Sequence, residues 1–192
     1  MRHHRSDVVE RAIDVLDMYG LPDMSMRRIA SELGLQPSAL YHHFANKQAL
    51  LAAVAYELLV RGARVSVVGT PWDEAVVALG HELRDAMLAY RDGAELIATA
   101  HAFGLGVQSP LDRIATALVE EGFDPELARG ASTTIVHFVF GHVYDEQTQL
   151  QAASAGAIDG APLTSAGAQS FEHGLALIID GSRLRRQVPE SR

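Results

Sequence analysis

Between residues 25 and 47 the polar side chains are of the kinds that read base edges and hold phosphates. Ser38, His42 and His43 are polar and short enough to approach the edges of bases in a groove. Ser25, Tyr41 and Lys47 can donate hydrogen bonds to phosphate oxygens. We place Arg27 and Arg28 near the same groove. This chemistry predicts contact with double-stranded DNA.

Each of these residues also has a purely structural interpretation. Tyr41 and Phe44 suit an aromatic core, and for Phe44 this is the interpretation we favour. The pair His42 and His43 fits an ordinary surface, and Lys47 fits a solvated helix start. We favour DNA contact because two predicted helices carry these residues.

Two short helices predicted around Gly34 position these side chains. Ser25 is a suitable N-cap for the first, whose inner face holds Ile29, Ala30 and Leu33. The second is predicted from Gln36 to about Phe44, with Pro37 in its first turn. This layout is a helix-turn-helix, whose second helix enters the major groove.

Helical periodicity continues through the rest of the chain, and strand alternation is nearly absent. A first helix is predicted at about residues 6–19, with Ser6 as N-cap, and Asn46 caps a helix over residues 47–64. Further helices are predicted at about 72–90, 94–100, 110–122, 125–151 and 171–184, with a mobile loop at 152–169. We therefore predict an all-α protein: a three-helix helix-turn-helix domain over residues 1–46, then a helical-bundle ligand-binding and dimerisation domain over 47–192, with helix 47–64 connecting the two.

The charge distribution agrees with DNA binding by the N-terminal helix-turn-helix domain, residues 1–46, which we call the head. The chain has 192 residues and a net charge of −8, but in residues 1–50 six basic and six acidic side chains balance, so the remainder carries the whole excess. The chain has no cysteine, which excludes disulfides, thiolate metal sites and cysteine nucleophiles. No apolar run is long enough to span a membrane, and the polar N-terminus is no signal peptide, so we expect a cytoplasmic protein.

The head resembles the TetR family of transcriptional repressors. The resemblance rests on Ser25-x-Arg27-x-Ile29-Ala30-x-x-Leu33-Gly34-Leu35 and on Leu40-Tyr41-x-His43-Phe44-x-Asn46-Lys47-x-x-Leu50-Leu51. It implies that Arg27, Gln36, Pro37 and Ser38 read bases. It also implies that Ser25, Tyr41, His43 and Lys47 clamp the DNA backbone.

The second half resembles the C-terminal domain of tetracycline-binding members of the family. The matching stretches are 90–94, 121–123, 137–147 and 171–181. In those members a histidine just after the Arg-Asp-Gly-Ala element holds a drug-bound magnesium ion, and the matching residue here is Ile97. Asp145 stands where they have a glutamate. Without the imidazole the magnesium loses its anchor, so we predict an effector other than tetracycline.

The inferred effector pocket is mainly apolar, which suits a hydrophobic or aromatic molecule. It comprises Leu79, Leu83, Met87, Ile97, Ile114, Leu118 and Phe138, with His101, His137 and Asp145 as polar members. The same apolar residues at helical spacing also fit the core of any helical bundle.

Family resemblance and DNA geometry both predict a homodimer on a palindromic operator, because one recognition helix reads too few base pairs. We place the interface where Ile135, Phe138 and Val139 meet the last helix, with Gly141, Gly174 and Gly181 allowing close approach. We expect the effector to shift the short sixth helix against the fourth, which then changes the spacing of the recognition helices.

Two alternatives remain open. The protein could be an activator, or a repressor that binds DNA only with ligand. A remote alternative is an all-helical metal-dependent enzyme that uses His81, Glu82, His101, His137, His142 and Asp145. Because His137 and His142 are five residues apart and no metalloprotease, phosphate-loop or nucleophile-elbow motif occurs, we expect no enzyme activity, no metal and no cofactor.

Overall fold

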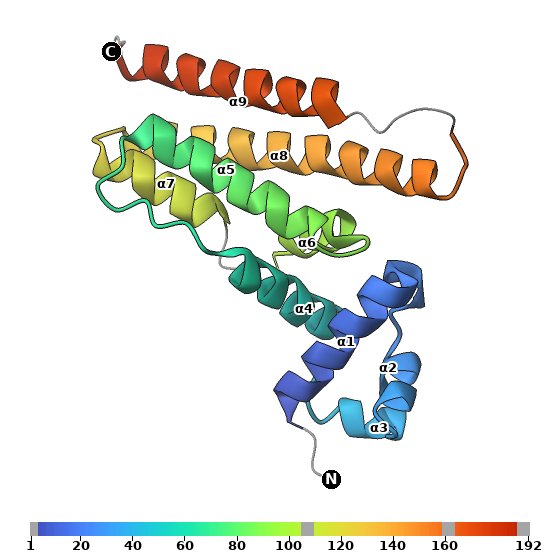
Figure 1. Cartoon of the computed structure of the whole chain (residues 1–192). Coiled ribbons are helices and arrows are strands. Elements are labelled where there is room, and N and C mark those ends of the chain that lie inside the picture. Colours follow the sequence, from blue (N-terminus) through green and yellow to red (C-terminus); the bar gives the residue numbers. More distant parts are fainter. Residues whose placement is uncertain (1–3, 105–109, 159–163, 188–192) are drawn as a thin grey trace. The chain divides into compact units, whose positions relative to one another are not determined.

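The computed structural model describes residues 4–104, 110–158 and 164–187; for residues 164–168 and 187 it describes the backbone alone. Within these ranges the chain is helical and forms no strand, as predicted. The helices are α1 (Arg5–Tyr19), η1 (Leu21–Asp23, a 3₁₀ turn), α2 (Met26–Glu32), α3 (Pro37–Leu40), α4 (Lys47–Gly62), α5 (Trp72–Leu88), α6 (Gly93–Ala102), α7 (Pro110–Glu120), α8 (Pro125–Ser154) and α9 (Thr164–Gln187) (Figure 1).

The helices form two units, each with its own core. Unit 1 comprises residues 1–63 and 85–108, and unit 2 comprises residues 64–84 and 109–192. Helices α1 to α4 and α6 therefore belong to unit 1, while α7, α8, α9 and most of α5 belong to unit 2.

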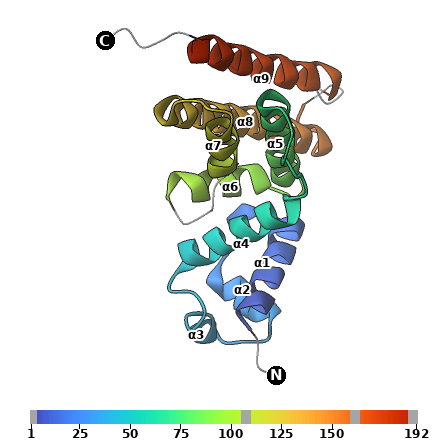
Figure 2. The ribbon, with the colours of Figure 1, turned by 90° about the vertical axis from the view of Figure 1, so that its left-hand side faces the viewer.

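In unit 1, α1 packs on α2 and α4, and α6 packs on the other side of α4 (Figures 1 and 2). Leu16, Ile29 and Leu40 are fully buried and join α1, α2 and α3 into one core. Where α4 ends, a Cβ at Gly62 would lie 2.6 Å from that of Ala86. Glycine therefore permits close contact there between α4 and the last turn of α5.

In unit 2, α8 packs against both α7 and α9, and α9 runs alongside α8 (Figure 1). Ile114 and Leu118 of α7 and Val136 of α8 are fully buried. The long helices are amphipathic, and burial of these apolar faces is the main stabilising contribution.

Local capping explains several helix starts. The hydroxyl of Ser25 accepts from the backbone N–H of Arg28 (3.2 Å), and Asn46 accepts from that of Ala49 (2.8 Å), so both predicted N-caps are confirmed. The predicted cap at Ser6 was wrong. Instead His4 is the N-cap of α1, and its N–H donates to the Asp7 carboxylate (2.7 Å). Asp7 lies in the first turn, where an acid can satisfy this donor.

Several other predicted boundaries differ from the structure. Helix α3 ends at Leu40 rather than near Phe44, and the chain continues as turns, in which the N–H of Phe44 still makes one helix-type bond to the Leu40 carbonyl (2.9 Å). Helix α8 extends to Ser154 and α9 begins at Thr164, so the predicted loop at 152–169 is shorter. Alanine favours helix strongly, which explains why the small residues at both ends are helical. Ser109, which directly precedes the predicted 110–122 helix and is its expected N-cap, lies outside the described residues.

Candidate nucleic-acid interface and effector residues

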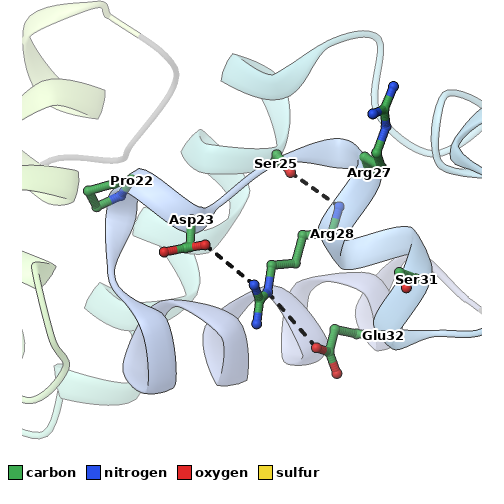
Figure 3. A pocket seen from close by; sticks show the side chains of 7 residues that line it. All are labelled: Pro22, Asp23, Ser25, Arg27, Arg28, Ser31 and Glu32. Atoms are coloured by element: carbon green, nitrogen blue, oxygen red, sulfur yellow. Dashed lines mark hydrogen bonds and ion pairs between the residues drawn. The ribbon is translucent and has the colours of Figure 1, made fainter.

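The two arginines at the start of α2 differ: within the described ranges Arg28 is held by acids, whereas no interaction holds Arg27. Arg27 is exposed, whereas the guanidinium of Arg28 lies 3.4 Å from Asp23 and 4.0 Å from Glu32. It also lies 3.7 Å from the centre of the Tyr19 ring. Figure 3 shows Arg28 directed at these carboxylates and Arg27 pointing away from them. Arg27 is therefore the better placed of the two to meet an external phosphate or base.

These residues line a surface pocket of about 460 Å³ (Figure 3). Besides both arginines it contains Ser25, Ser31 and Pro22. Ser25 is an exposed residue, and its hydroxyl acts as an acceptor when it caps α2, so the hydroxyl can still donate its own proton to a phosphate.

Helix α3 presents polar residues above a buried apolar anchor. Gln36 is its N-cap residue and Pro37 occupies the first position, as the missing N–H of proline allows. Gln36 and Ser38 are exposed, while Leu40 is fully buried beneath them.

The turn after α3 carries the aromatic and histidine candidates. Tyr41 is 54% exposed and His42 is also exposed, whereas His43 and Lys47 are half-buried. Phe44 is buried, with the guanidinium of Arg5 4.6 Å above its ring, so its interpretation as a core residue is confirmed. The ten predicted DNA-contact residues thus lie on α2 and α3 with their N-cap residues, on the turn after α3, and at the start of α4.

The predicted effector residues are divided between the two units. Met87, Ile97 and the half-buried His101 lie in unit 1, the first two fully buried. The buried members in unit 2 are Leu79, Leu83, Ile114 and Leu118.

Three residues of α8 that were predicted to line the effector pocket are not buried, unlike the other apolar residues predicted for it. His137 and Asp145 are exposed, and Phe138 is half-buried against α9. The Phe138 ring stacks on that of Phe171, with ring centres 5.7 Å apart, and fills the space left by the missing Cβ of Gly174. The absence of a side chain at Gly174 therefore allows a contact within the chain, between α8 and α9, rather than the expected close approach at the dimer interface.

The Arg91-Asp92-Gly93 turn, which sequence reasoning used only as a motif, connects α6 to the head. The Asp92 carboxylate accepts from the N–H of Leu21 (2.7 Å), and the N–H of Arg91 donates to Asp17 (3.3 Å). A Cβ at Gly93 would lie 2.5 Å from the carbonyl oxygen of Met87, which explains the glycine. The start of α6 is thus fixed to the end of α1 and to η1.

A buried carboxylate in unit 2 holds the segment after α4, a role that the sequence did not indicate, although Glu82 was named among the residues of the metal-enzyme alternative. Glu82, with a side chain only 8% exposed, accepts from the N–H groups of Arg64 (2.7 Å) and Val65 (2.6 Å) and pairs with Arg113. Arg113 also donates to the carbonyl of Val65 (2.9 Å). We call these four residues the Glu82 clamp. Amphipathic periodicity could not reveal it, because backbone groups are its partners.

Neither metal ligands nor membrane spans are evident in the described part of the chain. Within it, no three His, Asp or Glu side chains are grouped so as to hold a metal ion. No helix there is long and apolar enough to cross a membrane.

Comparison with known proteins accounts for both halves of the chain. Residues 8–54 match the family described as bacterial regulatory proteins, tetR family, and residues 68–169 match the tetracyclin repressor-like C-terminal domain. The tetracycline repressor protein class A of Escherichia coli is 35% identical over 197 residues, covering 94% of this chain and 91% of that protein.

Two solved structures are similar throughout. BioQ of Mycobacterium smegmatis is 38% identical with a TM-score of 0.86, covering 94% of this chain and 98% of its own. A structure of BioQ with its natural double-stranded DNA operator is 36% identical, has a TM-score of 0.81 and covers the same shares. The regulators of this family bind operator DNA as dimers and are released by ligand, and this chain belongs to the TetR family of bacterial transcriptional regulators.

Proposed function

We propose that this protein is a homodimeric repressor that binds a palindromic operator through α2, α3 and the start of α4. The observation that supports this proposal is that the ten candidates, nine of them polar or basic, lie on these elements and the turn after α3, over a core that includes Leu40. A match with a DNA-bound relative over nearly the whole chain supports it. The proposed role is binding rather than catalysis, and it places the protein with DNA in the cytoplasm.

Within this interface we assign base reading to Arg27, Gln36, Pro37 and Ser38. The exposure of Arg27, Gln36 and Ser38 supports the assignment, while Pro37 is half-buried and provides a rigid start to α3. Phosphate contact is assigned to Ser25, Tyr41, His43 and Lys47. The remaining two candidates have different local settings: His42 is exposed, and Arg28 is paired with acids of its own unit.

The dimer interface we propose lies on α8 and α9. Leu177 and Leu184, one heptad apart on α9, are 74% and 65% exposed, and Tyr144 of α8 is 47% exposed. Gly141 and Gly181 are exposed, with no atom near the position of an added Cβ, so a partner helix could approach closely there. Ile135 and Val139, which we expected at this interface, are instead buried in the chain's own core.

We propose a hydrophobic or aromatic effector other than tetracycline. Ile97, a buried apolar residue of unit 1, stands where tetracycline-binding members have the magnesium-holding histidine. Leu79 and Leu83, the expected members in unit 2, are also buried and apolar. An apolar lining with few polar groups suits an apolar ligand. The packing of α6 on α4 supports transmission through those two helices.

The test is binding of apo protein to fluorescent DNA from the flanks of its own gene, measured by anisotropy at several salt concentrations. We expect nanomolar affinity that falls steeply with salt, and loss of binding in the Tyr41→Ala/Lys47→Ala double variant. DNA binding that appears only with a ligand would replace the ligand-released repressor by a ligand-dependent one. A folded dimer that binds none of the flanking fragments would contradict the proposal.

A further inference from the structure

A second pocket lies wholly within unit 1, apart from the predicted effector residues. It has a volume of about 300 Å³ and is enclosed by η1, the first turns of α4 and one face of α6. Its apolar walls include Leu51, Leu96, Ala100 and Phe103, and Lys47 and Thr99 add polar groups. This volume is at the small end of the range for ligand pockets.

Lys47 is the polar residue of this pocket that most needs a partner. It is the first residue of α4, where the positive end of the helix dipole disfavours a cation. In the described part of the chain its ammonium makes no ion pair or hydrogen bond. An anion beside Lys47 would interact favourably with both the ammonium and the end of the helix.

Among the described residues that line the pocket, the one acid, Glu95, does not oppose this. Glu95 lies in the first turn of α6, where the helix dipole stabilises its carboxylate, and its side chain is exposed. Glu95 and Lys47 form no ion pair in the ranges that the structure describes. Glu95 therefore leaves the ammonium of Lys47 available to a ligand.

The apolar walls define the rest of the ligand. Phe103 is 61% exposed although it lines the pocket, so a flat ring placed against it would remove apolar surface from water. We propose that this pocket is a second ligand site, which binds a small aromatic carboxylate or sulfonate with its ring against Phe103 and its charge beside Lys47. This proposal rests on the proposed function in one respect, because the anion would compete with a DNA phosphate for Lys47.

The direct test needs no DNA. The probe is 1-anilinonaphthalene-8-sulfonate, and its uncharged counterpart N-phenyl-1-naphthylamine has the same rings without the sulfonate. We expect saturable sulfonate binding whose Kd rises at least about tenfold in Phe103→Ala or Ala100→Trp and about fivefold in Lys47→Gln. Ala102→Trp, an exposed position on the same helix, is the matched control and should bind as the wild type. The uncharged probe should not respond to Lys47→Gln.

A second readout uses the fact that Lys47 is the only lysine of the chain. Reductive ¹³C-methylation gives that side chain a single NMR signal, separable from the terminal amine by its pH dependence. The sulfonate should shift this signal with the same Kd as its fluorescence. Equal binding in Ala100→Trp, Phe103→Ala and Ala102→Trp, or an unmoved Lys47 signal, would overturn the site.

Competition with DNA is measured separately. If flanking DNA binds, the probe should weaken that binding in wild type and Ala102→Trp but not in Phe103→Ala. Unchanged DNA affinity at probe saturation would overturn the competition and leave the proposed repressor function standing. Failure of DNA binding altogether would contradict the repressor function and leave the direct test of the site valid.

Discussion

The carboxylate of Asp92 accepts a hydrogen bond from the backbone N–H of Leu21, at 2.7 Å, although 71 residues separate them in the sequence. Asp92 adopts a left-handed conformation, with φ of 55°, at the N-terminal end of α6. Asparagine and aspartate tolerate this conformation better than other side chains do. One residue therefore combines an unusual turn with a link between α6 and the head.

Replacing Asp92 should loosen this link. We expect Asp92→Ala to lower the free energy of unfolding by about 2–3 kcal/mol, because it removes the acceptor and adds backbone strain. Asp92→Asn keeps an oxygen and tolerates the turn, so it should lose less than half as much. Urea denaturation of both variants measures the difference. Equal losses would contradict this account, because asparagine retains both an acceptor oxygen and the tolerance of the left-handed turn.

The Glu82 clamp predicts a second stability effect. Glu82→Ala leaves two backbone N–H groups and Arg113 without their acceptor, so we expect a loss of about 2–4 kcal/mol. Faster amide exchange at Arg64 and Val65 should accompany it. Glu74→Ala, at an exposed position of the same helix, is the control and should change stability by under about 0.5 kcal/mol.

Gly174 gives a packing test. An alanine there would place its Cβ against the Phe138 ring, so Gly174→Ala should destabilise the protein by about 1–3 kcal/mol. Gly130→Ala on α8 meets open space and should stabilise by up to about 1 kcal/mol through helix propensity. Thermal denaturation of the pair checks the prediction, which fails if both substitutions shift the Tm in the same direction.

The two arginines of α2 should separate DNA affinity from stability. Arg27→Ala should weaken operator binding by about 1–3 kcal/mol with little change in stability, because Arg27 is exposed. Arg28→Ala should mainly lower stability, since Arg28 already contacts Asp23 and Tyr19. Anisotropy and denaturation on the same samples distinguish the two roles. A larger loss of affinity from Arg28→Ala would reverse the assignment.

Tetracycline with Mg²⁺ should not release this protein from DNA. Ile97 offers no metal ligand, so the drug–metal complex lacks an imidazole anchor at that position. We expect an unchanged DNA affinity when the complex is titrated to about 100 µM, some hundredfold above a micromolar Kd. A clear loss of DNA binding at that concentration would contradict the proposed effector class.

Local signals accounted for most of the fold. Ser25 and Asn46 have side chains that cap helices from nearby, and Gly34 ends α2, so these features follow from a few neighbouring residues. The helix from Thr164 was harder to predict, because small residues carry no apolar stripe to mark it.

At the candidate site, local sequence patterns did not predict the contacts of the side chains. Periodicity predicted which helix carries Arg28 but not that Asp23 and Tyr19 hold its guanidinium, because that contact depends on how η1 folds back. His137 and Asp145 were assigned by resemblance, and their exposure depends on the rotation of α8 about its axis. Contacts between distant segments, such as Leu21 with Asp92, leave no local pattern in the sequence.

Unit 1 is discontinuous, since residues 1–63 and 85–108 build it together. During synthesis, α1 to α4 leave the ribosome before α6, the helix that covers α4 and anchors η1 through Asp92. The head therefore cannot complete its own core cotranslationally until about forty further residues have been added and have left the exit tunnel. A nascent chain stalled before α6 would expose the apolar face of α4 to chaperones and proteases.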